Sequence, residues 1–480
     1  MHLTFHGAAQ TVTGSKYLLE VDGSQVLIDC GLFQGQKELR LRNWEKLPFD
    51  AHAVDAVVLT HAHIDHIGFL PRVVKLGYSG PVYATPATVD LAPVMLYDAA
   101  RAQEDDAEYA NRKHFSKHKP ALPLYDDNDV TNTLELLHSQ PRDVWFQAAG
   151  PIWCRYHDAG HLLGSAMIEV EIRNVDNSLR ELKSDSRSES ATKRAQPCRL
   201  LFSGDVGRYD APLYHDPVPP PACDYLICES TYGDREHPPE NVLDDLARVV
   251  NEAIKRGGVM VVAAFAVGRA QQLIYLLGVL IEQGRIPEMP IILDSPMSVA
   301  ANEVYCKYAV EHDLTEAAAT AARHALMAPY VQFSRTADQS KAINEIRSKA
   351  VIIASSGMMT GGRILHHLRQ RLPDARNTIL LGGFQAIGTR GRTLQDGAKF
   401  LRVFGQDIAV RAAIREISSL SGHAGHIELL RWLAPLPAPR RTFITHGERA
   451  SALALAEELH RARGWNTHAP QLGERVELSK

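Results

Sequence analysis

The pattern of hydrophobic and polar residues predicts short strands at the beginning of the chain. Residues 15–21 and 24–29 alternate between apolar and polar positions, and Asp22-Gly23 between them suits a tight turn. This arrangement predicts a hairpin. Residues 53–60 form an apolar run of strand length, and a polar cluster follows directly at 61–66. A buried strand that runs out into a polar loop is therefore expected there.

The same pattern recurs up to about residue 233. Helical spacing begins at residue 67, and a long charged helical region occupies 86–140. Residues 153–172 predict two strands around a polar loop, and 199–207 and 223–233 predict two buried strands that end in polar loops. The stretch 174–197 is rich in Ser, Arg and charge, so we interpret it as a solvated surface insertion.

Strands and helices alternate regularly over residues 238–405. An amphipathic helix is expected at 242–258, and further helices at 270–284 and 361–372. A buried strand is expected at 259–268, and further strands at 290–297, 349–359 and 377–383. This alternation predicts a parallel sheet covered on both faces. The tail returns to strands followed by His-rich loops. We expect one α/β domain interrupted by another, with boundaries at 1–231, 232–405 and 406–480.

Composition excludes several classes of protein. The chain has 480 residues, of which 45% are hydrophobic and 22% charged, so disordered, collagenous and coiled-coil proteins are excluded. No apolar stretch has the length of a membrane helix, no secretory signal is visible, and the six cysteines form no CxxC pair. A cytoplasmic location is expected. The net charge of −4 argues against coating of nucleic acid through bulk positive charge.

The histidine-rich loop after the strand at 53–60 is the strongest chemical feature. It contains His61, His63, Asp65 and His66 within six positions. Alternate residues of an extended chain point to the same side, so His61 and His63 can converge on one metal ion. Asp65 and His66 fall where the next helix begins and can face a second ion. Imidazole and carboxylate donors suit zinc and similar metals.

Further metal ligands are expected on other strand-end loops of the same sheet. His161, Asp205 and His446 each follow an apolar segment. Open α/β sheets collect functional groups at such ends. Asp29 also ends a strand, and its carboxylate could be a ligand or could orient a ligand histidine.

At this point the sequence resembles the metallo-β-lactamase superfamily, whose HxHxDH motif is matched by residues 61–66. More narrowly, it resembles the β-CASP nucleases, a group that includes the cleavage-and-polyadenylation endonuclease and bacterial ribonucleases. Stretches that carry the resemblance span nearly the whole chain: GAAQTVTGSKYLLE, DCGLFQG, LTHAHIDHIG, DAGHLLGSA, FSGDVGR, ESTYGDREH, FAVGRAQQLIYLL, DSPMS, ASSGMMTGGRILHHL, GGFQAIGTRGR, SGHAGH and THGE.

The resemblance implies an αββα sandwich interrupted by an inserted α/β β-CASP domain with a mainly parallel sheet. It implies two Zn²⁺ ions per chain, although the ligand types do not exclude manganese or iron. The family pattern assigns one ion to His61, His63 and His161, and the other to Asp65, His66 and His446. Asp205 would bridge the two.

The reaction implied is hydrolysis of a phosphodiester, which needs a general acid opposite the nucleophile. His423 is our candidate, with Glu229 keeping it protonated, and the resemblance supports both. His426 is a weaker candidate for the same role. By analogy, the histidine at position 446 favours RNA over DNA, so single-stranded RNA is the expected substrate.

A phosphate-binding loop is expected in the inserted domain. A strand runs into Gly357, and Gly361, Gly362 and Arg363 open a helix, where backbone amides can approach an anion. Arg269 lies at another junction between strand and helix, and we expect it to contribute positive charge.

Two other functions compete with a ribonuclease. A small-molecule hydrolase acting on a thioester, lactone or β-lactam could use the same metal core, but the long inserted domain argues against it. A non-catalytic RNA-binding subunit would have lost metal ligands, whereas every ligand position is filled here. The sequence does not choose between endonuclease and 5′–3′ exonuclease action, and it leaves open whether the chain forms a homodimer.

Overall fold

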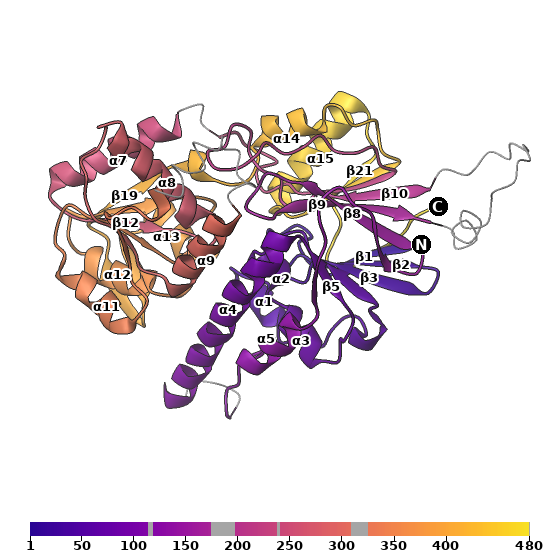
Figure 1. Ribbon diagram of the computed structural model, residues 1–480, viewed down its shortest axis with the longest axis horizontal. Coiled ribbons are helices and arrows are strands. Elements are labelled where there is room, and N and C mark those ends of the chain that lie inside the picture. Colours follow the sequence, from indigo (N-terminus) through magenta and orange to yellow (C-terminus); the bar gives the residue numbers. More distant parts are fainter. Residues whose placement is uncertain (114–118, 174–196, 238–240, 309–324, 480) are drawn as a thin grey trace, which may run out of the picture.

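The computed structural model of the chain has two lobes side by side (Figure 1). It describes residues 1–113, 119–173, 197–237, 241–308 and 325–479. Of the surface insertion expected at 174–197, residues 174–196 lie outside this described part.

The first lobe contains two seven-stranded sheets. One has the order β22-β1-β2-β3-β4-β5-β6, and the predicted hairpin is confirmed, since Tyr17 pairs with Ile28 and Val21 with Ser24. Its strands are β1 (His2–Phe5), β2 (Tyr17–Val21), β3 (Ser24–Ile28), β4 (Ala56–Val58), β5 (Val82–Ala84), β6 (Leu137–Ser139) and β22 (Arg475–Glu477).

The other sheet has the order β21-β20-β11-β10-β9-β8-β7. Its C-terminal strand β20 pairs in parallel with β11 (Tyr225 opposite Arg441), so the end of the chain lies beside strands of the first half. The strands are β7 (Phe146–Ala149), β8 (Ile152–Asp158), β9 (Ala166–Ile172), β10 (Cys198–Phe202), β11 (Tyr225–Cys228), β20 (Arg441–Ile444) and β21 (Thr467–His468).

The two sheets bury a common core, and helices cover their outer faces. Phe5 and Ile28 of one sheet and Phe202 and Phe443 of the other belong to one buried cluster. Figure 1 shows α14 and α15 above the sheets and the N-terminal helices below them. These helices are α1 (Lys37–Arg42), α2 (Ile64–Ile67), α3 (Leu70–Lys75), α4 (Pro86–Lys113), α5 (Asp127–Leu134), α14 (His426–Leu433) and α15 (Arg449–Arg463). The expected αββα sandwich is confirmed.

The inserted lobe is built on a six-stranded sheet of order β14-β13-β15-β12-β16-β19, and all its pairings are parallel. This confirms the parallel sheet expected from alternating strands and helices. Its strands are β12 (Met260–Ala263), β13 (Ile291–Leu293), β14 (Val331–Phe333), β15 (Val351–Ala354), β16 (Thr378–Leu381) and β19 (Ala413–Glu416).

Helices lie on both faces of the inserted sheet (Figure 1). The first of them begins where the Asn241 side chain accepts the N–H of Leu243 and ends at Gly257 with φ 71°. The helices are α7 (Val242–Arg256), α8 (Arg269–Glu282), α9 (Pro296–Lys307), α11 (Ala337–Ala342), α12 (Ile364–Arg371) and α13 (Arg390–Gln395).

The inserted sheet extends past the expected boundary at residue 405. A hairpin, β17 (Phe400–Val403) with β18 (Gln406–Ala409), precedes β19, which pairs with β16. The chain returns to the first lobe only after Glu416. In the described part of the chain, no helix combines the length and hydropathy that crossing a bilayer requires.

Candidate metal centre

The histidine-rich loop leaves β4 and ends in the short helix α2. His63 is extended and immediately precedes this helix. Gly31 lies so close to the loop that a Cβ on it would be 1.6 Å from the carbonyl oxygen of Asp65. That oxygen accepts the N–H of Ser15 at 2.9 Å. Close backbone packing therefore fixes the loop, and only glycine fits at position 31.

Four of the predicted ligands form a first donor cluster. His61 Nε2 lies 3.1 Å from His63 Nδ1, which lies 3.3 Å from His161 Nε2. Asp205 Oδ2 is 3.4 Å from His61 Nε2 and 3.6 Å from His161 Nε2. The donor atoms of this cluster are all within 4.8 Å of one another.

The other predicted ligands form a second cluster on the opposite oxygen of Asp205. The Nε2 atoms of His66 and His446 are 3.2 Å apart, and His446 Nε2 lies 3.5 Å from Asp65 Oδ2. Asp205 Oδ1 is 3.4 Å from His66 Nε2. The structure thus groups the seven residues as the resemblance implied, with one carboxylate between the two sets.

Asp29 lies behind the second cluster and holds His66. Its Oδ2 accepts the Nδ1–H of His66 at 2.8 Å, which leaves Nε2 facing the cluster. The hydroxyl of Thr60 donates to the same carboxylate and lies 3.0 Å from His61 Nδ1. This contact fits the second of the two roles considered from the sequence, in which Asp29 orients a ligand histidine.

Backbone and side-chain hydrogen bonds orient two further rings. His161 Nδ1 donates to the carbonyl of Gly422 at 3.1 Å, which leaves its Nε2 for the first cluster. Thr231 Oγ1 lies 3.2 Å from His446 Nδ1 and donates to the carbonyl of His446. His446 itself has φ 46°, in the left-handed region that non-glycine residues rarely occupy.

Burial and neighbouring charges determine which groups are ionised. Burial lowers the pKa of His61 to about 3 and that of His63 to about 4, so both imidazoles are neutral at pH 7. Burial opposes ionisation of Asp205, but the surrounding histidines hold its pKa well below the usual value. For His61, His63 and Asp205 these are the protonation states that metal ligation needs. His66 differs: burial lowers its pKa, but the Asp205 and Asp29 carboxylates outweigh burial and hold that pKa well above its usual value.

The donor set fits a pair of divalent cations. Asp205 Oδ1 is buried and has no hydrogen-bond partner among the described residues, although two imidazole rings surround it. Leaving a buried carboxylate oxygen unsatisfied is costly, and a bound cation removes that cost. His and Asp donors match zinc, and mixed N and O ligation also accepts other first-row metals.

His423 lies at the edge of the clusters and is hydrogen-bonded to Glu229. Its Nδ1 is 3.2 Å from Glu229 Oε1, and its Nε2 is 3.9 Å from Asp205 Oδ2. Backbone N–H groups of Val206 and Thr231 donate to the Glu229 carboxylate at 2.6 and 3.1 Å. Burial lowers the pKa of His423, but the two carboxylates outweigh this effect and raise it overall.

His426, the weaker candidate, is not part of these clusters. Its Nδ1 donates to the carbonyl of Gly233 at 2.8 Å. His423 also belongs to a third group of potential metal-binding donors, with Asp205 and His446. Geometry alone therefore allows His423 to be either a ligand or an acid.

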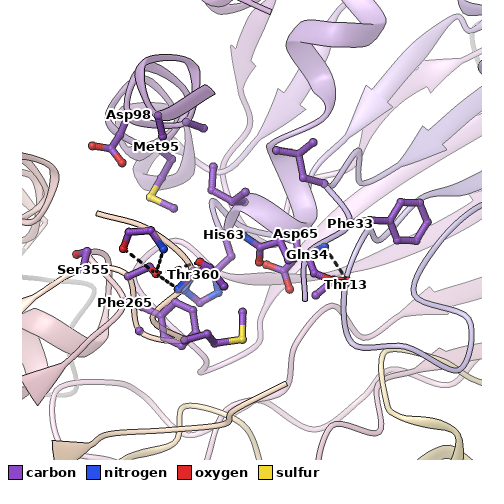
Figure 2. Close-up of a pocket in the computed structure, with 18 of the residues that line it drawn as sticks. Thr13, Phe33, Gln34, His63, Asp65, Met95, Asp98, Phe265, Ser355 and Thr360 are labelled. Atoms are coloured by element: carbon purple, nitrogen blue, oxygen red, sulfur yellow. Dashed lines mark hydrogen bonds between the residues drawn. The ribbon is translucent and has the colours of Figure 1, made fainter. Parts of the chain in front are cut away.

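The two lobes enclose one large cavity beside the clusters. Its volume is about 590 Å³, and residues of both lobes line it, including His63, Asp65 and His423. Figure 2 shows His63 and Asp65 on one side of the cavity, and Phe265, Ser355 and Thr360 on another.

Arg269 lines the cavity at the start of α8. The residue is 9% exposed, and its guanidinium donates to Gln272 and has an Nε with no hydrogen-bond partner among the described residues. Burial lowers the pKa of Arg269 to about 10, yet it stays charged at pH 7. Within the described chain no carboxylate pairs with it, so its charge is available to an anion.

The glycine-rich loop also lines the cavity, but its amides are partly in use. The N–H groups of Thr360 and Gly361 donate to Ser356 Oγ at 2.9 and 3.3 Å. A Cβ on Gly357 would lie 2.8 Å from the Phe265 ring, so this glycine makes room for an aromatic side chain. Gly362 has φ 80°. Two amides of the loop are therefore already used inside it, and the hydroxyl-bearing residues Ser355, Ser356 and Thr360 are among those that line the cavity.

The structure does not bring Arg363 into the cavity. Its guanidinium donates to Asp294 Oδ1 at 2.8 Å and to two oxygens of Ser334. The other Asp294 oxygen accepts from His367 at 2.7 Å. Arg363 therefore belongs to a buried ion-pair network that joins β13 to α12.

Three supporting residues were not found from the sequence. Thr60 and Thr231 orient ligand rings, and Phe265 lies 6.0 Å from His63, measured between ring centroids. The position of Thr60 next to the first motif histidine is the only sequence signal among them. The other two contacts depend on how distant segments pack.

Comparisons with known proteins agree with this geometry. Three family models match the chain: a metallo-beta-lactamase superfamily domain over residues 18–180, a Beta-Casp domain over 270–394, and a Zn-dependent metallo-hydrolase RNA specificity domain over 407–470. The last of these contains both His423 and His446.

Curated relatives extend over nearly the whole chain. Ribonuclease TTHA0252 of Thermus thermophilus is 34% identical over 99% of this chain and 100% of its own length. Transcription termination factor FttA of Methanosarcina mazei is 29% identical over 98% of this chain and 70% of its own length. An RNase J-like protein of Methanocaldococcus jannaschii is 27% identical over 98% of both chains.

A solved structure shares the fold. The crystal structure of a protein of unknown function from Enterococcus faecalis has a TM-score of 0.51 and 13% identity, over 99% of each chain. Sequence, fold and family models therefore agree: the chain belongs to the β-CASP group of the metallo-β-lactamase superfamily.

Proposed function

We propose that the protein is a metal-dependent ribonuclease that hydrolyses phosphodiester bonds of single-stranded RNA. The observation that carries the proposal is the position of two His/Asp clusters, which share Asp205, beside a cavity lined by both lobes. The RNA specificity domain at 407–470 and the relatives named as ribonucleases favour RNA as the substrate.

Seven residues would hold the cations. We assign one Zn²⁺ to His61, His63 and His161, and another to Asp65, His66 and His446, with Asp205 between the two. Two such ions would make a water nucleophilic at neutral pH and neutralise charge that develops on the phosphate oxygens. All seven ligands come from one chain, so the site is complete in a monomer.

His423 would supply the proton that the departing 3′ oxygen needs. Water loses a proton to solvent and adds to phosphorus, the bond to the 3′ oxygen breaks, and the Nε2–H of His423 protonates that oxygen, which leaves 5′-phosphate and 3′-hydroxyl ends. His423 then regains a proton from solvent. The contact with Glu229 keeps the ring oriented and protonated, because the raised pKa of His423 favours the charged form. Glu229 therefore acts through His423.

Arg269 and the hydroxyls of the 355–362 loop would hold neighbouring phosphates. Arg269 is buried at the cavity wall without a carboxylate partner in the described chain. A charge in that position gains more from an anion than a surface arginine does. The negative net charge of the chain does not oppose this, since binding depends on local charge.

Substrate and product analysis tests the proposal. The enzyme is expected to cleave an unstructured RNA oligonucleotide to fragments with 5′-phosphate ends and to leave a β-lactam, a thioester and a lactone intact. Turnover of one of these small molecules, together with intact RNA, would instead indicate a small-molecule hydrolase. Loss of cleavage in Asp65→Ala and His66→Ala would assign the activity to this centre.

A further inference from the structure

The cavity has a part that the proposed chemistry does not use. It follows α4 from Met95 to Ala110, a distance of about 22 Å at 1.5 Å per residue. The end of α1 and the loop at 121–124 also line it, and this loop lies against α4, since the Leu124 N–H donates to Gln103 Oε1 at 3.2 Å. We call this part the outer arm, and its lining includes Arg40, Trp44, Gln103, Ala107, Leu122 and Pro123.

Two large apolar side chains in the outer arm are exposed to solvent. Trp44 is 52% exposed and Leu122 is 65% exposed. Both line the same cavity as His63 and His423, so the arm is continuous with the candidate metal centre. Exposed apolar surface of this kind marks a binding surface when it is part of a cavity.

Hydrogen bonds from two asparagines hold the walls that carry these side chains. The buried Asn43, next to Trp44, accepts the N–H of Phe33 at 3.0 Å and donates to its carbonyl at 2.9 Å. Asn111 accepts the N–H of Ala121 at 2.7 Å and donates to its carbonyl at 2.9 Å. Trp44 and Leu122 are therefore presented on fixed turns, which reduces the entropy cost of binding.

The charges of the arm favour bases over phosphates on the α4 side. Asp98 and Asp106 of α4 line the cavity and are exposed, so they repel a phosphate backbone. Arg40 lines the arm together with Trp44. An aromatic ring and a guanidinium plane are the surfaces on which unpaired bases stack, whatever their sequence.

We propose that the outer arm binds unpaired nucleotides of the RNA substrate, with a base stacked on Trp44. The proposal rests on the ribonuclease function. It adds that the affinity for RNA depends on the length of the substrate. At about 3.4 Å per stacked nucleotide, 22 Å of arm accommodates on the order of six nucleotides. RNA long enough to fill the arm is bound more tightly than RNA that reaches only the metal centre.

Steady-state kinetics of Trp44→Ala on two substrates tests this subsite. For an unstructured dodecamer, KM is expected to rise about tenfold with kcat unchanged, because one stacking contact is lost. A trinucleotide too short to reach the arm should show wild-type kinetics, and Trp44→Phe should restore most of the affinity. Leu41→Ala is the matched control, since Leu41 lies on α1, is 53% exposed and does not line the cavity.

Two results would overturn the subsite. One is an unchanged KM for the dodecamer, which would mean that the arm receives another ligand, such as a protein segment. The other is an equal loss on both substrates, which would indicate a structural effect.

If the wild type cleaves no RNA, the ribonuclease proposal fails separately. Dodecamer binding by the chelated protein, measured by fluorescence anisotropy, then still tests the arm: tenfold weaker binding by Trp44→Ala supports it, and equal binding overturns it.

Discussion

At the scale of single residues, the site separates groups that would touch a cation from groups that orient them. The first set faces the shared Asp205 carboxylate, and the second, with Asp29, Thr60 and Thr231, lies one hydrogen bond further out. Substitutions of these residues should therefore differ in whether they change metal content or turnover.

Replacing His423 should affect turnover without removing metal. His423→Ala is expected to lower kcat by about 10²–10⁴, the range for loss of a general acid, with zinc content unchanged. Glu229→Gln should give a smaller loss of the same kind. Metal analysis of the purified variants checks this, and loss of one ion from His423→Ala would make it a ligand instead.

Weakening the hydrogen bond between Asp29 and His66 should lower the affinity for metal. Asp29→Asn removes the charge that His66 Nδ1–H contacts, so zinc affinity should fall about 10- to 100-fold. Competition with a chromophoric chelator measures this. Asp55→Asn serves as control, because that carboxylate accepts an exposed backbone N–H far from the clusters. Equal zinc affinities for Asp29→Asn and Asp55→Asn would contradict the assigned role.

At the scale of secondary-structure elements, Asp294 joins β13 to α11 and α12. It is fully buried and accepts from Arg363, His367 and Ser340. The glycine-rich loop lies between β15 and α12, so this network also holds the loop at the cavity wall.

Removing the network should destabilise the inserted domain. Asp294→Ala is expected to cost about 3–5 kcal/mol in free energy of unfolding, because it leaves buried donors without a charge partner. Asp396→Ala breaks an exposed ion pair with Arg392 and should cost under about 1 kcal/mol. Denaturant unfolding of both variants provides the comparison. Similar losses in free energy of unfolding for the two variants would show that the buried network stabilises the domain no more than an exposed ion pair does.

The same network predicts how stability depends on pH. Burial opposes ionisation of Asp294, but hydrogen bonds from His367, Ser334 and Ser340 lower its pKa to about 2. This value is below that of an unfolded aspartate, so the stabilisation is present above about pH 4 and is lost as pH falls toward 2. The Tm difference between wild type and Asp294→Ala should therefore shrink over that interval, and a constant difference would rule out this origin.

The sequence predicted elements and strand-end residues better than it predicted the partners of long side chains. His61, Asp205 and His446 each follow an apolar strand, as expected, but the expectation that all these strands belong to one sheet was wrong. His61 follows β4 of one sheet, whereas Asp205 and His446 follow β10 and β20 of the other, so the packing of the two sheets brings these strand ends together. Arg363 had a local context that suggested phosphate binding, but its partner Asp294 is far along the chain. The pairing of β19 with β16, past the expected boundary, is likewise a long-range contact with no local signal.

At the scale of the whole molecule, the metal centre ties the two ends of the chain together. His66 lies near the start of the sequence and His446 near its end, and their Nε2 atoms are 3.2 Å apart. Cations bound between them would stabilise the folded state only. At a free concentration of 100 times Kd, such binding adds about 2.7 kcal/mol per site.

Chelation should therefore lower the melting temperature of the wild type. His446→Ala should show a smaller decrease on chelation, because one cluster is already incomplete. Differential scanning calorimetry with and without chelator measures both. An unchanged Tm of the wild type would contradict the proposal that the folded chain binds metal at these clusters.

Cleavage of end-labelled, unstructured RNA with and without chelator is the most direct measurement. The ribonuclease proposal predicts 5′-phosphate fragments from the metal-loaded wild type, none after chelation, recovery when Zn²⁺ is restored, and none from Asp205→Ala under any of these conditions. Cleavage at the wild-type rate by the chelated protein or by Asp205→Ala would contradict it.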